Sequence, residues 1–243
     1  MFSQPFDQFK NYFRPYIQQV PAEEVFIGTI LFYVIFSLAF FMCDHGNLEC
    51  AANTIMFYNS WIVCFAILLY LITANIVCCV IAVASFLASS LAEIVLGTLY
   101  YPSRMFLSTY MHHIIYSIYA IGSIYFNTPS FTIGIIAACI ELSAIFQSIK
   151  RMWNVKSMAF DIVNAAVFFF IRIIVWVPLM IAMYLWCEST AEKASVGFMS
   201  LFFFFHVFWS WTQIRNLHRR YFTINGTINN DISELYLTPD SLN

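Results

Sequence analysis

Two adjacent histidines, His112 and His113, lie inside an uncharged, aromatic-rich stretch from Ser108 to Phe126 that is long enough to cross a lipid bilayer. Ionisable side chains are costly in hydrocarbon, at roughly 2.5–3.5 kcal/mol each, so they tend to face a protein interior or a wet cavity. Imidazole titrates near neutral pH, which suits it to general acid–base catalysis or to carrying an acyl group from a thioester. The alternative role is a hydrogen bond between helices, worth about 0.6 kcal/mol on average in membranes.

Glu141 is the candidate partner of this pair. Consecutive helical residues point about 100° apart, so His112 and His113 cannot both face one cavity, and we expect one of them to face an adjoining helix. A carboxylate on the next apolar segment can orient such an imidazole, as in a catalytic triad. Glu141 has two other possible states, a protonated one and one paired with Arg172. Ser143 lies two residues on, on a different face, where a small packing residue is the alternative role.

Arg172 lies fifteen residues into the apolar segment 158–186, so we expect it deep in the membrane. Its planar fork suits bidentate contacts to a fatty carboxylate, a phosphate or another anionic head group. The alternatives are snorkelling and pairing with Glu141 or Glu93. On the last apolar segment, His206 and Trp209 are three apart and share a face, and a Trp near a helix end is typical of an interfacial anchor.

Four other polar residues are expected at helix ends. Asn59 and Ser60 open the second apolar segment, which predicts an interfacial position for both. Asp161 and Asn164 share a helical face at an expected cytoplasmic entrance, where a solvated helix start is the favoured interpretation.

The composition predicts an integral membrane protein. Only 10% of the 243 residues are charged, against about 25% in a soluble domain, and the mean hydropathy is +0.76. Apolar runs of this length predict an all-α, polytopic membrane helix bundle of about seven transmembrane helices, with six as the alternative. The expected spans are 25–43, 56–78, 80–101, 106–126, 130–149, 158–186 and 196–214. The second and third are the hardest to divide, and their turn is expected near Ala82 to Ser90.

The organisation along the chain follows from these spans. A polar N-terminal arm (1–24) without the apolar core of a cleavable signal peptide precedes a first helix and loop (25–53), which we expect to act as a signal-anchor. The main transmembrane domain covers 54–220, and a polar tail covers 221–243. An outside N-terminus places seven basic residues in the cytoplasm and three outside, which predicts a cytoplasmic C-terminus. The seven are Arg104, Lys150, Arg151, Lys156, Arg215, Arg219 and Arg220. The acceptor Asn225 would then stay unglycosylated.

Several classes of function are disfavoured. The net charge of −2 gives no basic surface for nucleic acid, so no nucleic-acid partner is expected. There is no Gly-rich phosphate loop, and no HxxHH pattern of the kind iron-dependent desaturases use. The Cys residues show no metal spacing, and Cys43 and Cys50 flank a loop placed in the reducing cytosol, where a disulfide is not expected. We therefore expect no metal and no cofactor, with acyl-CoA as a substrate if the protein is an enzyme.

The polar residues follow an order along the chain: the pair His112-His113, then Glu141-Leu142-Ser143, then Phe168-Phe169-Phe170-Ile171-Arg172 followed by Pro178. This order, over about residues 54–220, resembles the TLC-domain family, which includes ceramide synthases and translocating-chain-associated membrane proteins. Ceramide synthases carry two Asp residues three apart where the segment Ala137 to Gln147 has Glu141 and no Asp. Pro102-Ser103 stands where many relatives keep an Asp. The chain therefore resembles more closely the smaller TLC-domain-containing branch, which has a Glu-x-Ser signature.

The resemblance implies a role in lipid homeostasis, through control of membrane phospholipid and acyl composition and of fluidity. The implied partners are membrane lipids, acyl chains or acyl-CoA, in a cavity surrounded by six of the helices in the endoplasmic reticulum or plasma membrane. Its polar lining would comprise His112, His113 and Glu141 as catalytic candidates and Arg172, Ser143 and His206 as head-group contacts. One alternative function is an acyl-CoA-dependent acyltransferase of the ceramide synthase type. The other is a seven-helix receptor, although short loops such as Asn127 to Pro129 leave little outside surface for a ligand.

Overall fold

The computed structural model describes residues 18–43, 48–100, 102, 107–126, 128, 130–187 and 189–222. Most of the N-terminal arm, Arg104, Ser103 and Asn225 lie outside these residues, as do the side chains of Cys43 and Cys50. The described helices are α2 (Ala22–Cys43), α3 (Leu48–Thr73), α4 (Ile76–Tyr100), α5 (Leu107–Tyr125), α6 (Ser130–Met152), α7 (Met158–Phe169), the π-helix η3 (Phe170–Val175), α8 (Trp176–Trp186), α9 (Thr190–Ser200) and α10 (Phe202–Phe222).

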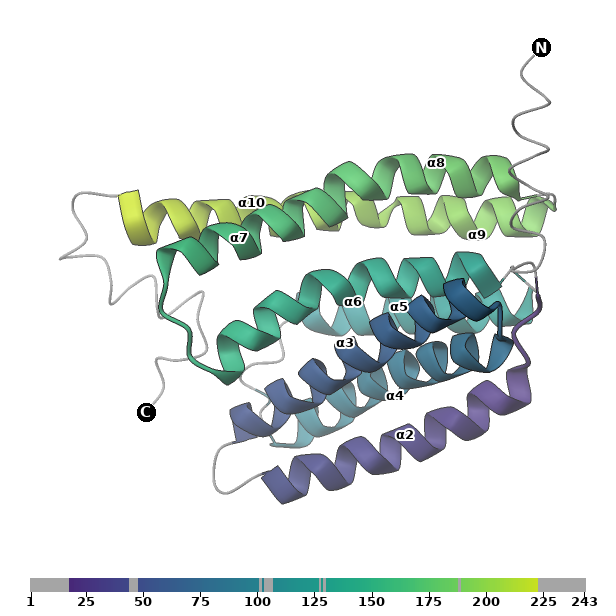
Figure 1. The fold of residues 1–243 in the computed structure, drawn as a ribbon, viewed down its shortest axis with the longest axis horizontal. Helices are drawn as coiled ribbons and strands as arrows, with labels where there is room; N and C mark the ends of the chain where they lie inside the picture. Colours follow the sequence, from purple (N-terminus) through teal and green to yellow (C-terminus); the bar gives the residue numbers. More distant parts are fainter. Residues whose placement is uncertain are drawn as a thin grey trace, which may run out of the picture.

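These helices form the polytopic all-α bundle that the sequence predicts. The helices α7, η3 and α8 form one long pass, as do α9 and α10 (Figure 1). Six passes are long and apolar enough to cross a membrane. The pass outside that set is α5, which carries the two histidines and several hydroxyl side chains over its 19 residues. The described chain is therefore a multipass membrane protein of six to seven helices.

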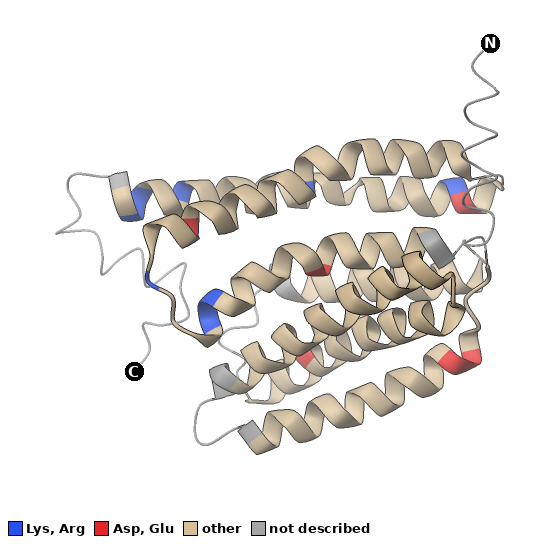
Figure 2. Cartoon of the chain, in the orientation of Figure 1, with Lys and Arg blue, Asp and Glu red and all other residues tan. Residues whose placement is uncertain are grey.

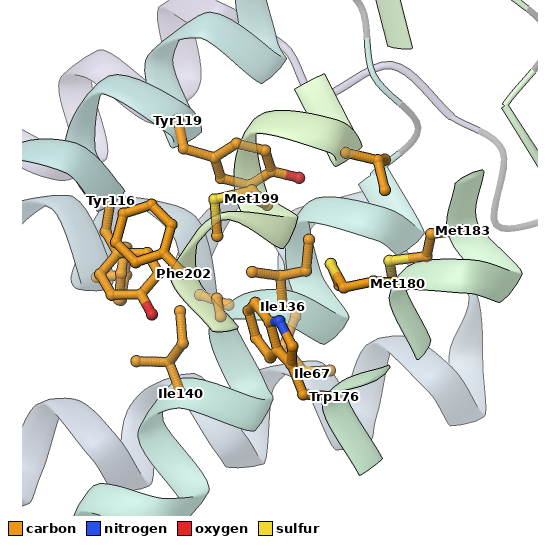
Figure 3. Packing of buried hydrophobic residues seen from close by; sticks show 14 of the residues in the cluster. Ile67, Tyr116, Tyr119, Ile136, Ile140, Trp176, Met180, Met183, Met199 and Phe202 are labelled. Atoms are coloured by element: carbon orange, nitrogen blue, oxygen red, sulfur yellow. The ribbon is translucent and has the colours of Figure 1, made fainter. Parts of the chain in front are cut away.

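The passes are arranged in two groups. Helices α2 to α6 lie side by side, with α3 against both α4 and α6 and with α2 against α4 at one edge (Figure 1). The pair made by α7–α8 and α9–α10 lies along the other side, where α7 and η3 contact α6 and α9 contacts α5. The main apolar core, which includes Tyr116, Ile136 and Trp176, lies between the two groups (Figure 3).

Charge is separated between the two ends of the bundle. Lys and Arg gather where α6 and α10 end, and the opposite end carries Glu23 and Glu24 at the start of α2 and Glu192 and Lys193 in α9 (Figure 2). We call the first of these the basic end. The basic residues that the sequence analysis assigns to the cytoplasm, as far as they are described, lie at this one end.

The turn between the second and third passes differs from the expectation. The chain breaks at Ala74 and Asn75, and Ala82 to Ser90 lie in the buried middle of α4. Ala74 takes a left-handed φ of 52°, and the Asn75 side chain accepts from the Val77 N–H at 3.0 Å, so that it caps the start of α4. A two-residue break of this kind hardly interrupts the apolar run, which is why hydropathy does not locate it.

Small residues allow α2 and α4 to approach closely. A Cβ built on Gly28 would lie 2.9 Å from the Cβ of Ala84, and Ala88 and Ala92 of α4 are fully buried. Such close contacts between small residues are a common basis of helix association in membranes. By contrast, a Cβ on Gly122 of α5 would meet nothing within 4 Å.

The two glycines give a matched pair of substitutions with opposite expected signs. Gly28→Ala should destabilise the protein by about 1–2 kcal/mol, because the new methyl group separates α2 from α4. Gly122→Ala should be neutral or stabilise by up to about 1 kcal/mol, because alanine favours the helix and meets open space. Denaturant unfolding in mixed micelles measures both. Equal effects of the two substitutions would contradict this account of the α2–α4 contact.

Candidate functional site

A π-helical turn places Arg172 at the centre of the bundle. Pro178 has no N–H to donate to the carbonyl of Ile174, and its ring would clash with that carbonyl in a regular α-helix. The wider turn η3, Phe170–Val175, ends three residues before Pro178 and contains Arg172. Such π-turns occur frequently at functional sites. Arg172 is 3% exposed and therefore lies inside the bundle.

The guanidinium of Arg172 contacts only uncharged groups. Its Nε donates to Ser143 Oγ at 2.7 Å, and its Nη2 donates to the carbonyl oxygen of Ile140 at 2.8 Å. The ring of Phe168 lies below the guanidinium carbon, 5.1 Å from it. No ion pair in the described part of the chain joins Arg172 to a carboxylate. The buried guanidinium therefore has only uncharged hydrogen-bond partners, and it forms an ion pair with neither Glu141 nor Glu93, although Glu141 lies near enough to act on it through space.

His206 completes the surroundings of Arg172, and its contacts define its tautomer. An arginine has only donors, so Arg172 Nη1, 3.1 Å away, requires His206 Nε2 to accept. Tyr116 Oη lies 2.9 Å from the same nitrogen. The other nitrogen, Nδ1, lies 3.2 Å from the carbonyl oxygen of Arg172 and therefore donates to it. Arg172, Ser143 and His206, the three expected head-group contacts, thus meet in one cluster.

Two buried ring nitrogens near this cluster have no hydrogen-bond partner among the described residues. Trp176 is fully buried, its ring packs edge-on against His206 at 4.5 Å between centroids, and its Nε1 is unpaired. The second is His112 Nδ1; the His112 ring lies 4.5 Å from that of Tyr116. An unpaired buried donor costs about 1–3 kcal/mol, so natural proteins rarely keep one without a reason.

The two histidines face different helices, as their spacing predicts. His112 faces α10, where its ring lies 5.1 Å from that of Trp209. The ring centroids of Trp209 and His206 lie 6.3 Å apart, which confirms that the two residues share a face of α10. Trp209 also packs against His112 of α5, so it contacts other helices in addition to any role as an interfacial anchor. His113 faces α4, where its Nε2 lies 2.8 Å from Glu93 Oε2 and its Nδ1 lies 3.4 Å from Ser90 Oγ. The carboxylate that contacts the histidine pair is therefore Glu93, and the expected contact with Glu141 is not formed.

Glu141 is buried elsewhere in the same interior. Its Oε2 accepts from Ser60 Oγ at 2.5 Å, and its exposure is 7%. Asn59, the neighbour of Ser60, accepts from Ser85 Oγ at 2.8 Å and is likewise buried. The interfacial position expected for Asn59 and Ser60 is therefore wrong. Both face the neighbouring helices α6 and α4, and α3 begins eight residues before the expected span, so that they lie well inside the helix and not at its start.

Asp161 is also more enclosed than the sequence suggests. Its side chain is 6% exposed and pairs with Lys150 of α6 at 2.5 Å and with Arg220 of α10 at 3.0 Å. Tyr221 Oη donates to the same carboxylate at 2.9 Å. The expected solvated helix start is therefore wrong at this residue, since three side chains from two other helices shield it.

A small apolar recess, partly open, adjoins the Arg172 cluster between α4, α5 and α6. It is lined by Val83, Phe86, Tyr116, Tyr119, Ala120, Ile133, Ile136, Ala137 and Ile140. Two of these residues also contact the polar cluster. The Ile140 carbonyl accepts a hydrogen bond from Arg172, and the Tyr116 hydroxyl lies within hydrogen-bond distance of His206 Nε2. Tyr116 and Ile140 are seen with their apolar neighbours in Figure 3. The recess has room for about one water molecule, so an acyl chain would enter it only if the neighbouring side chains moved.

No protein-family model, curated protein or solved structure matches this chain. The resemblance to the TLC-domain family therefore stays a prediction that rests on the ordered motifs. Within the described residues, no group of three or more His, Cys, Asp or Glu side chains is placed to hold a metal ion.

Sequence reasoning did not assign four members of the polar interior to the site, although it names Glu93 and Ser60 in other roles. Glu93 had a usable signal, since it is the only charge between residues 54 and 101. Trp176 is four residues after Arg172 and Tyr116 four after His112, so helical spacing places both near the cluster. Ser60 gave no signal, because its partner Glu141 lies 81 residues away and depends on how α3 packs against α6.

Proposed function

We propose that this chain is a multipass membrane protein of the TLC-domain type that acts in lipid homeostasis, where it regulates membrane phospholipid and acyl composition and fluidity. In this proposal the protein binds the anionic group of a lipid at Arg172. The observation that carries the proposal is the buried guanidinium, whose partners are all uncharged.

The energetic argument starts from the cost of burying that charge. An ion removed from water costs several kcal/mol even after the protein relaxes, and an opposite charge with good hydrogen bonds offsets this cost. A carboxylate or phosphate is the natural counterpart, because the planar fork of arginine binds either one through two donors. A fatty acid or an anionic phospholipid supplies this anion, and the small recess beside the cluster would have to widen to admit its acyl chain.

The proposed orientation places the basic end, and with it the C-terminus, in the cytoplasm. Support comes from the described Lys and Arg residues at the ends of α6 and α10, which follow the usual excess of positive charge on the cytoplasmic side. The membrane proposed is that of the endoplasmic reticulum or the plasma membrane.

One observation favours a second candidate function, an acyl-CoA-dependent acyltransferase of the ceramide synthase type. Glu93 lies 2.8 Å from His113 Nε2, an arrangement that can hold an imidazole in one tautomer and raise its basicity. His112 next to it retains an unpaired Nδ1. Either imidazole can act as a general base or acyl carrier in this candidate. The receptor alternative gains no support, because Glu141 and the Nδ1 of His112 are buried inside the bundle.

Quantitative lipidomics of cells separates these functions. We expect expression of the wild type to change the acyl composition of phospholipids, and Arg172→Gln to abolish the change. The double variant His112→Ala/His113→Ala should keep the change if the protein regulates by binding, and lose it if the protein is an acyltransferase. Arg151→Gln, at an exposed arginine near the end of α6, is the matched control. An unaltered lipid profile with wild type, or a full effect with Arg172→Gln, would contradict the proposal.

A further inference from the structure

The contact between α7 and α10 is fixed by polar interactions at two levels. At the basic end, Asp161 Oδ2 accepts from Arg220 at 3.0 Å and from Tyr221 at 2.9 Å. In the middle of the bundle, Arg172 of η3 contacts His206 at 3.1 Å. Helix α10 packs against α7 and η3 along this length, and we call their interface between the two levels the seam.

Polar side chains lie in the seam beside the buried apolar Ala165 and Phe168 of α7. Ser210 and Gln213 follow His206 by four and seven residues, so they share its face of α10. Asn164 follows Asp161 by three residues and shares its face of α7. Ser210 is 4% exposed. The seam therefore carries amide and hydroxyl groups at a depth where the neighbouring faces of both helices carry apolar side chains such as Phe208 and Ile162, which are exposed on the surface of the bundle.

Three polar atoms of the seam are buried and unpaired within the described part of the chain: Asn164 Oδ1, Ser210 Oγ and Gln213 Oε1. A buried polar atom without a partner costs about as much as a lost hydrogen bond, and the cost is greater where hydrocarbon surrounds the protein. Buried water, which typically makes about three hydrogen bonds to groups of this kind, can satisfy such atoms.

We propose that the seam is a hydrated path, a site for bound water that joins the basic end of the bundle to Arg172. The water molecules bind Gln213, Asn164 and Ser210 in turn and reach the His206–Arg172 pair. This path makes the buried guanidinium accessible to aqueous solutes and ions from the basic end only. Entry of an anionic head group from that side rests on the proposed function, whereas hydration of the seam does not.

Accessibility of an introduced thiol tests the path. Ser210→Cys in the full-length protein, reconstituted in sealed vesicles, is treated with a charged, membrane-impermeant methanethiosulfonate, and modification is read by peptide-resolved mass spectrometry. A thiol reacts as the thiolate, which forms in water and not in hydrocarbon. We expect Ser210→Cys to react at least tenfold faster from the basic end than from the other side. It should also react at least tenfold faster than Phe208→Cys, two residues away on the outer face.

A second substitution closes the path without touching the reporter. Gln213→Leu, combined with Ser210→Cys, should slow modification of the thiol by tenfold or more, because leucine removes the polar groups between the thiol and the basic end. If Ser210→Cys fails to insert, Gln213→Cys serves as the reporter instead. Its rate of modification from the basic end is then compared with its rate from the other side. Reaction no faster than at Phe208→Cys, or faster from the opposite side, would overturn the inference. A dry seam in a protein that still binds anions through Arg172 refutes only this inference. A hydrated seam without anion binding refutes only the proposed function.

Discussion

Arg172→Gln is expected to weaken binding of an anionic amphiphile by roughly 2–4 kcal/mol, or about 30- to 1,000-fold in Kd. The wild-type guanidinium brings a full positive charge to a buried site, and its hydrogen-bond partners Ser143 and His206 are both uncharged. Glutamine retains an amide donor for the Ile140 carbonyl but has no charge. Arg172→Lys should fall between the two, because it retains the charge and loses the planar fork.

The measurement is a titration of the protein in nanodiscs with oleate and, separately, with a phosphatidic acid. Trp176 and Trp209 lie against the cluster, so their fluorescence can report binding. Tighter binding of one ligand identifies the anion as carboxylate or phosphate. Arg151→Gln should leave both values unchanged. Equal affinities of the wild type and Arg172→Gln for both ligands would show that the buried charge has no role in binding.

Trp176 allows packing and ligand binding to be separated. The side chain is fully buried in the main core, beside Ile67 and Ile136 (Figure 3), so Trp176→Ala should destabilise the protein by about 3–5 kcal/mol. Trp176→Phe retains an aromatic ring but removes the unpaired Nε1–H. Because that donor has no protein partner, its loss should cost little stability beyond the reduced ring size, at about 1 kcal/mol.

Ligand binding is expected to respond to Trp176→Phe even though folding does not. If Nε1 donates to the bound anion, this substitution should raise Kd about five- to tenfold, which corresponds to one lost hydrogen bond. Denaturant unfolding in mixed micelles and the nanodisc titration give the two values. A wild-type Kd in Trp176→Phe, or a stability loss as large as that of Trp176→Ala, would contradict the assigned role of the indole nitrogen.

Much of the architecture could be predicted from hydropathy. The pass 158–186 has the bounds that the sequence indicates, because Ser157 caps its start and the apolar run ends where Cys187 leaves the helix. The grouping of Arg172, Ser143 and His206 also agrees with the prediction. Each has a polar atom that hydrocarbon cannot satisfy, so the three helices that carry them turn these residues toward one another.

The errors concern which residue meets which across helices. Glu93 and Glu141 are both acidic residues in apolar helices, and no local pattern reveals that the first faces His113 and the second faces Ser60. Which partner each glutamate meets depends on how α4 and α6 are rotated about their own axes. A shift of one residue along the helix turns the side-chain direction by about 100°. Asp161 was misjudged for the same reason, since its shielding groups come from the ends of α6 and α10.

Native mass spectrometry of the protein purified from cells in a mild detergent tests the central claim most directly. The wild type should retain a lipid whose mass and fragmentation identify a fatty acid or an anionic phospholipid, and Arg172→Gln should lose it while Arg151→Gln retains it. A wild type that carries no anionic lipid, or an Arg172→Gln variant that carries the same lipid at the same occupancy, would contradict the assignment of Arg172 as a lipid anion site.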